Sequence, residues 1–84
     1  MQEEQIIAGL QARDRKTTEY LYERYSAPLY AVICKTISDQ RLAEEVFHRS
    51  FLKITKEIEC YNCPKGHLYT WMAWICRSCA RKRV

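Results

Sequence analysis

Apolar side chains that return every three or four positions constrain the fold of this chain more than any other feature of its sequence. Leu21, Tyr25, Leu29 and Val32 follow this spacing, which places them on one face of an α-helix. Glycine and proline, the residues that most often interrupt helices, number only two each in 84 residues. The pattern predicts an all-α fold, a compact bundle of three to four helices.

The ends of four expected helices follow from capping residues and turn formers. Their approximate ranges are 3–12, 14–37, 40–58 and 68–83, with a loop over 59–66. Asp14 is a favourable N-cap for the second helix, and Asp39 for the third. Pro28 predicts a kink or break near Ser26, because proline removes a backbone donor and clashes with the preceding turn.

The composition fits one small folded domain over residues 1–84. Hydrophobic residues make up 48% and charged residues 29%, which excludes a disordered tail. No apolar run approaches the ~20 residues that span a bilayer, and the N-terminus is acidic where a signal peptide is basic. We therefore expect a cytoplasmic protein without a membrane partner. A chain this short is not expected to form a deep catalytic cleft, so an enzyme is not predicted.

Positive charge is concentrated in the C-terminal part of the chain. Residues 1–52 hold seven Lys/Arg and eight Asp/Glu, whereas residues 53–84 hold seven and two. No acidic residue follows Glu59, and the later basic residues are interleaved with aromatic ones. This pattern is typical of a nucleic-acid surface. For the last three basic residues, the alternative is a solvated helix end whose cations complement the helix dipole.

The expected 68–83 helix has two distinct faces. One stripe is apolar and is predicted to pack: Leu68, Met72, Ile75, Cys76 and Cys79. The other stripe holds Trp74, Arg77, Ser78 and Arg81. A large aromatic residue beside two arginines on an outward face indicates a binding surface. Packing of Trp74 at the edge of the core is the alternative.

Two CxxC pairs form a pattern that would instead predict a zinc site. Twelve residues separate Cys60 and Cys63 from Cys76 and Cys79, and four thiolates at such spacing can hold a zinc ion. A zinc ribbon, however, needs a β-strand over 68–75. It also needs a tight turn at the second CxxC pair, and residues 76–83 contain no Gly, Pro or Asn to form one. Free cysteine also packs as a small apolar residue. We therefore expect no metal and no cofactor, with a zinc-binding adaptor as the alternative.

The order and spacing of several stretches are distinctive over nearly the whole chain. They are LYERY at 21–25 with Leu29-Tyr30, LAEEV at 42–46, FLKI at 51–54, GHLYTW at 66–71 and ICR at 75–77. This combination resembles region two of extracytoplasmic-function sigma factors, bacterial subunits that direct RNA polymerase to promoters. The resemblance implies a transcription-initiation module that binds the β′ clamp helices and recognises and melts the minus-ten promoter element.

The resemblance also implies which residues meet each partner. The surface for RNA polymerase would be Asp39, Glu44, Glu45, His48 and Arg49. His48 stands where the family usually has glutamine, and Arg49 where an acid is usual. The surface for the non-template single strand would be Lys53, Lys56, Tyr61, Asn62, Lys65, Tyr69, Trp74, Arg77, Ser78 and Arg81. Opened bases need aromatic faces to stack on, and phosphates need cations.

Three further expectations complete the sequence-based hypothesis. Family members carry a second helical domain for the minus-thirty-five element, which these 84 residues lack, so we expect a fragment or a truncated product. An anti-sigma factor is a further expected partner, besides RNA polymerase core and promoter DNA. The remaining alternative is a helical protein-interaction domain without DNA binding.

Overall fold

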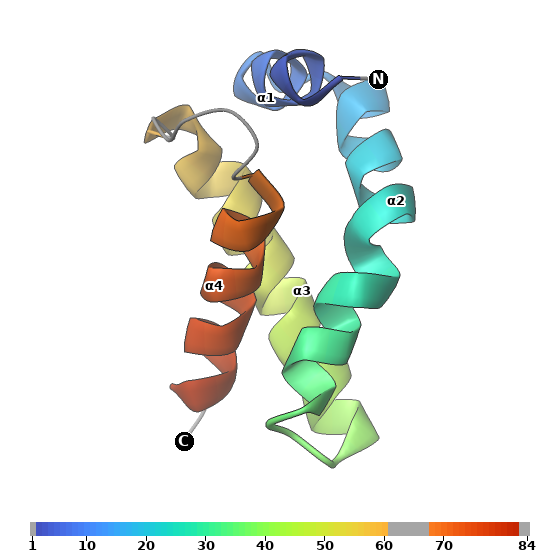
Figure 1. Cartoon of the computed structure of the whole chain (residues 1–84), viewed down its shortest axis with the longest axis vertical. Helices are drawn as coiled ribbons and strands as arrows, with labels where there is room; N and C mark the ends of the chain where they lie inside the picture. The colour runs from blue at the N-terminus through green and yellow to red at the C-terminus, as the bar shows by residue number, and fades with distance from the viewer. Residues whose placement is uncertain (1, 61–67, 83–84) are drawn as a thin grey trace.

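The computed structural model describes residues 2–60 and 68–82, which form four α-helices and one 3-10 turn (Figure 1). The α-helices are α1 (Glu3–Gln11), α2 (Arg15–Cys34), α3 (Gln40–Glu57) and α4 (Leu68–Arg81), and the turn is η1 (Ile58–Cys60). The described residues contain no β-strand. The predicted all-α bundle of three to four helices is confirmed.

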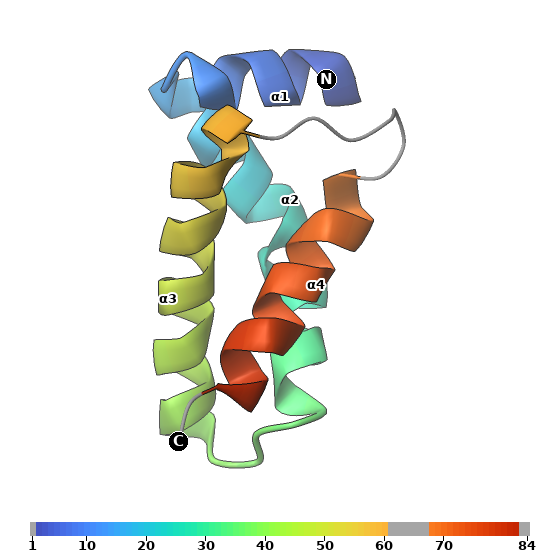
Figure 2. The ribbon, with the colours of Figure 1, turned by 90° about the vertical axis from the view of Figure 1, so that its left-hand side faces the viewer.

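Helices α2, α3 and α4 pack against one another along their length, while α1 lies across one end of them (Figures 1 and 2). α3 runs antiparallel to both α2 and α4. The end of α2, the start of α3 and the end of α4 therefore lie at the end of the bundle opposite α1. The core between the helices contains aliphatic side chains that are almost fully buried, among them Leu21, Leu29, Ile33, Ile54, Met72 and Ile75.

Two aspartates fix where α2 and α3 begin. Asp14 accepts hydrogen bonds from the backbone N–H of Thr17 at 3.1 Å and from its hydroxyl at 2.5 Å. Asp39 accepts one from the backbone N–H of Arg41 at 3.0 Å. Such bonds satisfy donors in the first turn, which have no partner within the helix. The two bonds from Thr17 lower the pKa of Asp14, and both predicted N-caps are confirmed.

Pro28 lies inside α2, which runs unbroken from Arg15 to Cys34. Of the predicted kink or break near Ser26, the break is therefore wrong. Proline leaves the carbonyl of Arg24 without its helical donor. Both Arg24 and Pro28 are exposed, so water can hydrogen-bond to that carbonyl instead.

The ends of the four helices lie close to those expected from the sequence. The largest difference is at α2, which was expected to reach Ile37 but ends at Cys34. Ile37 nevertheless stays in the core, because its N–H donates to the carbonyl of Ile33 at 2.9 Å. Of the expected 59–66 loop, Glu59 and Cys60 lie in η1, and the rest falls outside the described residues. No described helix is long and apolar enough to cross a membrane.

Candidate nucleic-acid interface

The outward face of α4 is set by the burial of its opposite face. The predicted packing stripe is confirmed, since four of its members are at most 1% exposed: Leu68, Met72, Ile75 and Cys76. The helical period then turns Trp74, Arg77 and Arg81 toward solvent. Trp74 is 60% exposed, so the alternative in which it packs at the core edge is wrong.

The cations of α4 have no acidic partners in the described part of the chain. The ion pairs there involve Arg13, Arg15, Arg49 and Lys53, none of which belongs to α4. α4 itself contains no Asp or Glu, and Arg77, Arg81 and Lys82 are all exposed. Unpaired surface cations attract polyanions, and each contact with a phosphate releases a counterion. The face therefore combines an exposed aromatic ring with available positive charge.

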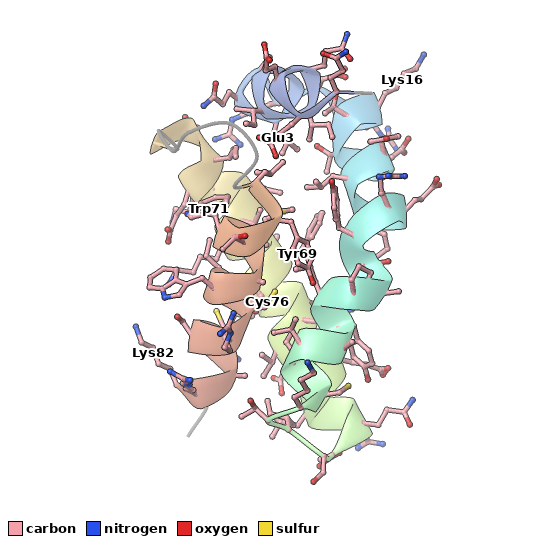
Figure 3. The ribbon with its side chains drawn as sticks, in the orientation of Figure 1. Glu3, Lys16, Tyr69, Trp71, Cys76 and Lys82 are labelled. Carbon is pink, nitrogen blue, oxygen red and sulfur yellow. The ribbon has the colours of Figure 1, made fainter. Side chains whose placement is uncertain are left out.

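Tyr69 lies differently from Trp74. It points from α4 toward α2 (Figure 3), where its ring centroid is 6.0 Å from that of Tyr25. The residue is 39% exposed, so part of it serves the contact between the two helices. Of these two rings on α4, Trp74 offers the larger free surface for stacking on a base.

The remaining predicted DNA-binding residues are not all described, and those that are lie on two helices. Tyr61, Asn62 and Lys65 fall outside the described residues. Ser78 is half-buried on α4. Lys53 and Lys56 lie on α3 and line a shallow groove with Leu52 and Glu57. The Nζ of Lys53 is 3.8 Å from the carboxylate of Glu57, which offsets part of its charge.

A second surface is formed by the outward side of α3. Glu45, His48 and Arg49 are exposed there at helical spacing, and the guanidinium of Arg49 is 3.7 Å from the carboxylate of Glu45. Leu52 continues this face and is 69% exposed. We did not assign Leu52 to this surface from the sequence. Its spacing, one helical turn after His48 and two turns after Glu45, was the signal that could have placed it there.

Beside this face, a groove of about 310 Å³ is lined by residues of both α2 and α3. It is lined by Tyr22, Ser26, Ala27, Tyr30, Glu44, Phe47 and His48. The ring of Tyr22 lies edge-on to Phe47 and Phe51, at centroid distances of 5.9 and 5.3 Å. Partial burial raises the pKa of Tyr30, and the neighbouring Cys34 thiol adds to this effect. Aromatic surface of this kind is enriched where proteins bind other proteins.

The second CxxC pair lies on α4. Residues 68–75 are helical, whereas a zinc ribbon requires a strand there, so the ribbon form of the zinc alternative is wrong. Cys76 is buried and its thiol faces Ser50 of α3. Burial raises the pKa of Cys76 to about 11. The side chain of Cys60 and all of Cys63 lie outside the described residues.

Comparison with known proteins identifies the family. A family model described as sigma-70 region 2 matches residues 21–84. The chain belongs to the sigma-70 region 2 family. No curated protein and no solved structure matches it. The match spans most of α2 and all of α3 and α4, whereas α1 lies outside it.

Membership of the sigma-70 region 2 family gives the two surfaces a common context. Domains of this family are transcription-initiation modules, which bind core RNA polymerase and take part in promoter melting. A region 2 domain therefore needs one surface for protein and another for DNA. Aromatic and apolar groups lie beside the outward side of α3, and α4 carries cations that form no ion pair with the described residues.

Proposed function

We propose that residues 1–84 act as region two of an extracytoplasmic-function sigma factor, which binds the opened minus-ten element through α4. The observation that carries this proposal is the exposed Trp74 on a helix face with Arg77 and Arg81, which form no ion pair within residues 2–60 and 68–82. An indole ring can stack on any base once the base has left the duplex. The arginines bind phosphates and fix the position of the strand without reading its sequence. The preferred ligand is the non-template single strand.

The same proposal places the β′ clamp helices on α3. Leu52 would be the apolar centre of this contact, and Glu45, His48 and Arg49 would form its polar surround. A few central residues usually dominate the affinity of an interface, while the surrounding ones exclude water. Asp39 and Glu44 would extend the contact at the start of α3, and Glu44 also lines the aromatic groove beside it.

Two single substitutions, one on each surface, test the two halves of the proposal. Trp74→Ala should weaken binding to a labelled pool of short random single-stranded DNA by ~1–3 kcal/mol, the usual cost of losing one stacked base. It should leave retention on immobilised bacterial core RNA polymerase unchanged. Leu52→Ala should have the opposite pattern, with weaker retention on the polymerase and unchanged affinity for DNA.

Each variant serves as the control for the other. Both side chains are exposed, so neither substitution should change the free energy of unfolding by more than ~0.5 kcal/mol. Absence of salt-dependent DNA affinity in the wild-type chain would reject the DNA half and favour a helical protein-interaction domain. Equal polymerase retention by wild type and Leu52→Ala would reject the α3 assignment.

A third proposed partner is an anti-sigma factor that covers the outward side of α3. A protein bound over Leu52 and the adjacent aromatic groove would block access of the polymerase to the same residues. Competition between such a factor and core RNA polymerase for this chain would support the assignment. The bacterial cytoplasm is the proposed location, because the polymerase and the promoter are found there.

A further inference from the structure

Cys76 (labelled in Figure 3) and Cys79 are two free thiols of α4 that the proposed function leaves unused. They stand three residues apart, so their side chains leave the helix on the same side. Cys76 is fully buried and faces Ser50 of α3. Cys79 packs against the edge of the core and is only half-buried. One sulfur is therefore shielded by the protein, whereas its neighbour is partly open to solvent.

The geometry of the helix brings these two thiols close together. A helix with a rise of ~1.5 Å per residue and a radius of ~2.3 Å separates Cα atoms three residues apart by ~5 Å. Disulfides join residues whose Cα atoms lie ~4.4–6.8 Å apart, so the two cysteines are within bridging distance. The pKa of Cys76 agrees with this closeness, because burial raises it to about 11 and the neighbouring Cys79 thiol adds to the effect.

A disulfide between the two cysteines would distort α4 locally. Cβ atoms three residues apart on a helix are separated by ~5–6 Å, whereas a disulfide holds its Cβ atoms at ~3.5–4.5 Å. The turn from Cys76 to Cys79 must therefore tighten by ~1 Å to close the bond. Arg77 and Ser78, which the proposed function places against DNA, lie within that turn. Oxidation of the two thiols would thus change the backbone of the proposed DNA surface itself.

Apolar packing is the simpler explanation for Cys76, because free cysteine behaves as a small hydrophobic residue. This explanation suits a side chain with no exposed surface. It gives no reason for a second thiol at Cys79, where the side chain is partly open to solvent. A shielded thiol beside an accessible one is instead the arrangement that a reversible dithiol needs, since the accessible thiol reacts and the shielded one closes the bond.

We propose that Cys76 and Cys79 form a redox-sensitive dithiol site, which hydrogen peroxide converts to a disulfide that weakens DNA binding by α4. The effect on DNA binding rests on the proposed function, whereas formation of the disulfide does not. Disulfides in cytosolic proteins are usually transient and either catalytic or redox-sensing. A strained disulfide is also more easily reduced, so a small thiol would return the chain to its DNA-binding form.

Cys79 is the thiol that peroxide reaches first, because it is the more accessible of the two. Its thiolate attacks one oxygen of hydrogen peroxide, so that an S–O bond forms, the O–O bond breaks and hydroxide leaves. The sulfur of Cys76 then attacks the resulting sulfenic acid. An S–S bond forms as the S–O bond breaks, and the departing hydroxide takes the Cys76 proton to become water. Two thiols lose two electrons, and one peroxide becomes two water molecules.

Arg77 lies between the two cysteines, so digestion with trypsin reports the disulfide directly. Cleavage yields peptides 66–77 and 78–81, each of which contains one cysteine. The folded chain is treated with hydrogen peroxide, its remaining thiols are alkylated, and the digest is weighed by mass spectrometry. The two peptides should stay joined until a reductant is added. Two separate peptides, or linkage of either one to peptide 57–65 with the first CxxC pair, would overturn the proposed site.

The salt dependence of DNA binding tests the consequence of oxidation. Affinity for the pool of short random single-stranded DNA is measured over a range of salt concentrations, before and after treatment with peroxide. Oxidation should make the slope of log K against log salt shallower by ~0.7, the contribution of one phosphate contact to a single strand. A dithiol reductant should restore the original slope. An unchanged slope in a chain whose disulfide has formed would overturn the effect on DNA binding.

Cys79→Ser and Cys34→Ser are the matched pair of variants. Cys79→Ser removes the thiol that reacts first, so its slope should equal that of reduced wild type with or without peroxide. Cys34→Ser removes an exposed thiol at the end of α2 and should keep the wild-type response. The opposite pattern would overturn the assignment to α4. Absence of DNA binding by reduced wild type would reject the proposed function, whereas joined peptides would still establish the dithiol site.

Discussion

The carboxylate of Glu3 accepts a hydrogen bond from the backbone N–H of Leu68, with 3.3 Å between Oε1 and N. The bond joins the first residue of α1 to the first residue of α4, and Figure 3 shows Glu3 below α1 on the side of the bundle. N–H groups in the first turn of a helix lack partners within it, and a negative charge there also complements the dipole. α1 therefore caps a helix that lies far away in the sequence.

α1 and Arg13, two residues after its end, also contact η1. The side-chain amide of Gln11 donates to the carbonyl of Ile58 at 2.9 Å, and Arg13 forms an ion pair with Glu59. These contacts lie just before residues 61–67, whereas the bond to Leu68 lies just after them. A helix outside the region matched by the family thus fixes the chain on both sides of the segment expected to read the promoter.

Glu3→Ala should destabilise the protein by ~0.5–2 kcal/mol, the usual cost of losing a helix cap. The free energy of unfolding from urea titration followed by circular dichroism measures this effect. Glu23→Ala is the control, because Glu23 is an exposed carboxylate of α2 without an ion pair in the described part of the chain. Equal stability of the two variants would contradict the capping role of Glu3.

Arg13 adopts a left-handed backbone conformation, with φ of 59°. Such a conformation costs an L-residue ~1–2 kcal/mol, whereas glycine adopts it freely. Both Arg13→Gly and Arg13→Ala remove the exposed ion pair with Glu59, which contributes at most ~1 kcal/mol. Arg13→Gly should therefore be more stable than Arg13→Ala by about 1 kcal/mol in chemical denaturation. Equal values would show that the turn relaxes around alanine.

Gly9 lies where α1 crosses the start of α2. A Cβ atom at this position would come within 2.3 Å of the Thr17 hydroxyl oxygen, and Thr17 is buried and bound to Asp14. Gly9→Ala should therefore destabilise the protein by ~1–3 kcal/mol through overpacking, although alanine is the better helix former. Thermal unfolding measures the change. The exposed neighbour Ala8 should show the reverse preference, with alanine more stable than glycine by ~1 kcal/mol.

The sequence predicts most of the fold because helix formation here follows local patterns. The apolar stripe of α4 and the N-caps Asp14 and Asp39 are short-range features, and the structure confirms them. Trp74 could be assigned to the surface for the same reason, since one buried stripe determines which side of a helix faces solvent. The predicted break at Pro28 is wrong because the carbonyl that proline leaves without a donor lies in an exposed part of α2, where water can hydrogen-bond to it.

Features that depend on packing between helices could not be predicted from the sequence. Lys35 and Arg77 share a groove only because α2 and α4 lie side by side. Glu3 reaches Leu68 only because α1 crosses the end of the bundle. The periodicity of each helix determines its own buried face, but it does not determine which neighbouring helix covers that face. These contacts depend on crossing angles and side-chain shape.

The buried thiol of Cys76 links the α3–α4 interface to pH. Burial raises its pKa to about 11, so the folded protein holds this proton over a range in which the unfolded chain releases it. The folded state binds more protons than the unfolded state there, and stability therefore falls as pH rises. The contribution is complete below the ordinary thiol pKa and is lost as pH passes through about 11.

Cys76→Ala isolates this contribution, because all other titrating groups remain in the variant. The variant should be less stable than wild type at neutral pH, since it leaves a small cavity beside Ser50. The difference between the two proteins should then shrink between the ordinary thiol pKa and about 11, because in this range the thiol of unfolded wild type ionises, which favours unfolding of wild type alone. Urea denaturation at several pH values measures the difference. A constant gap over this range would show that the thiolate is accommodated in the folded protein without cost.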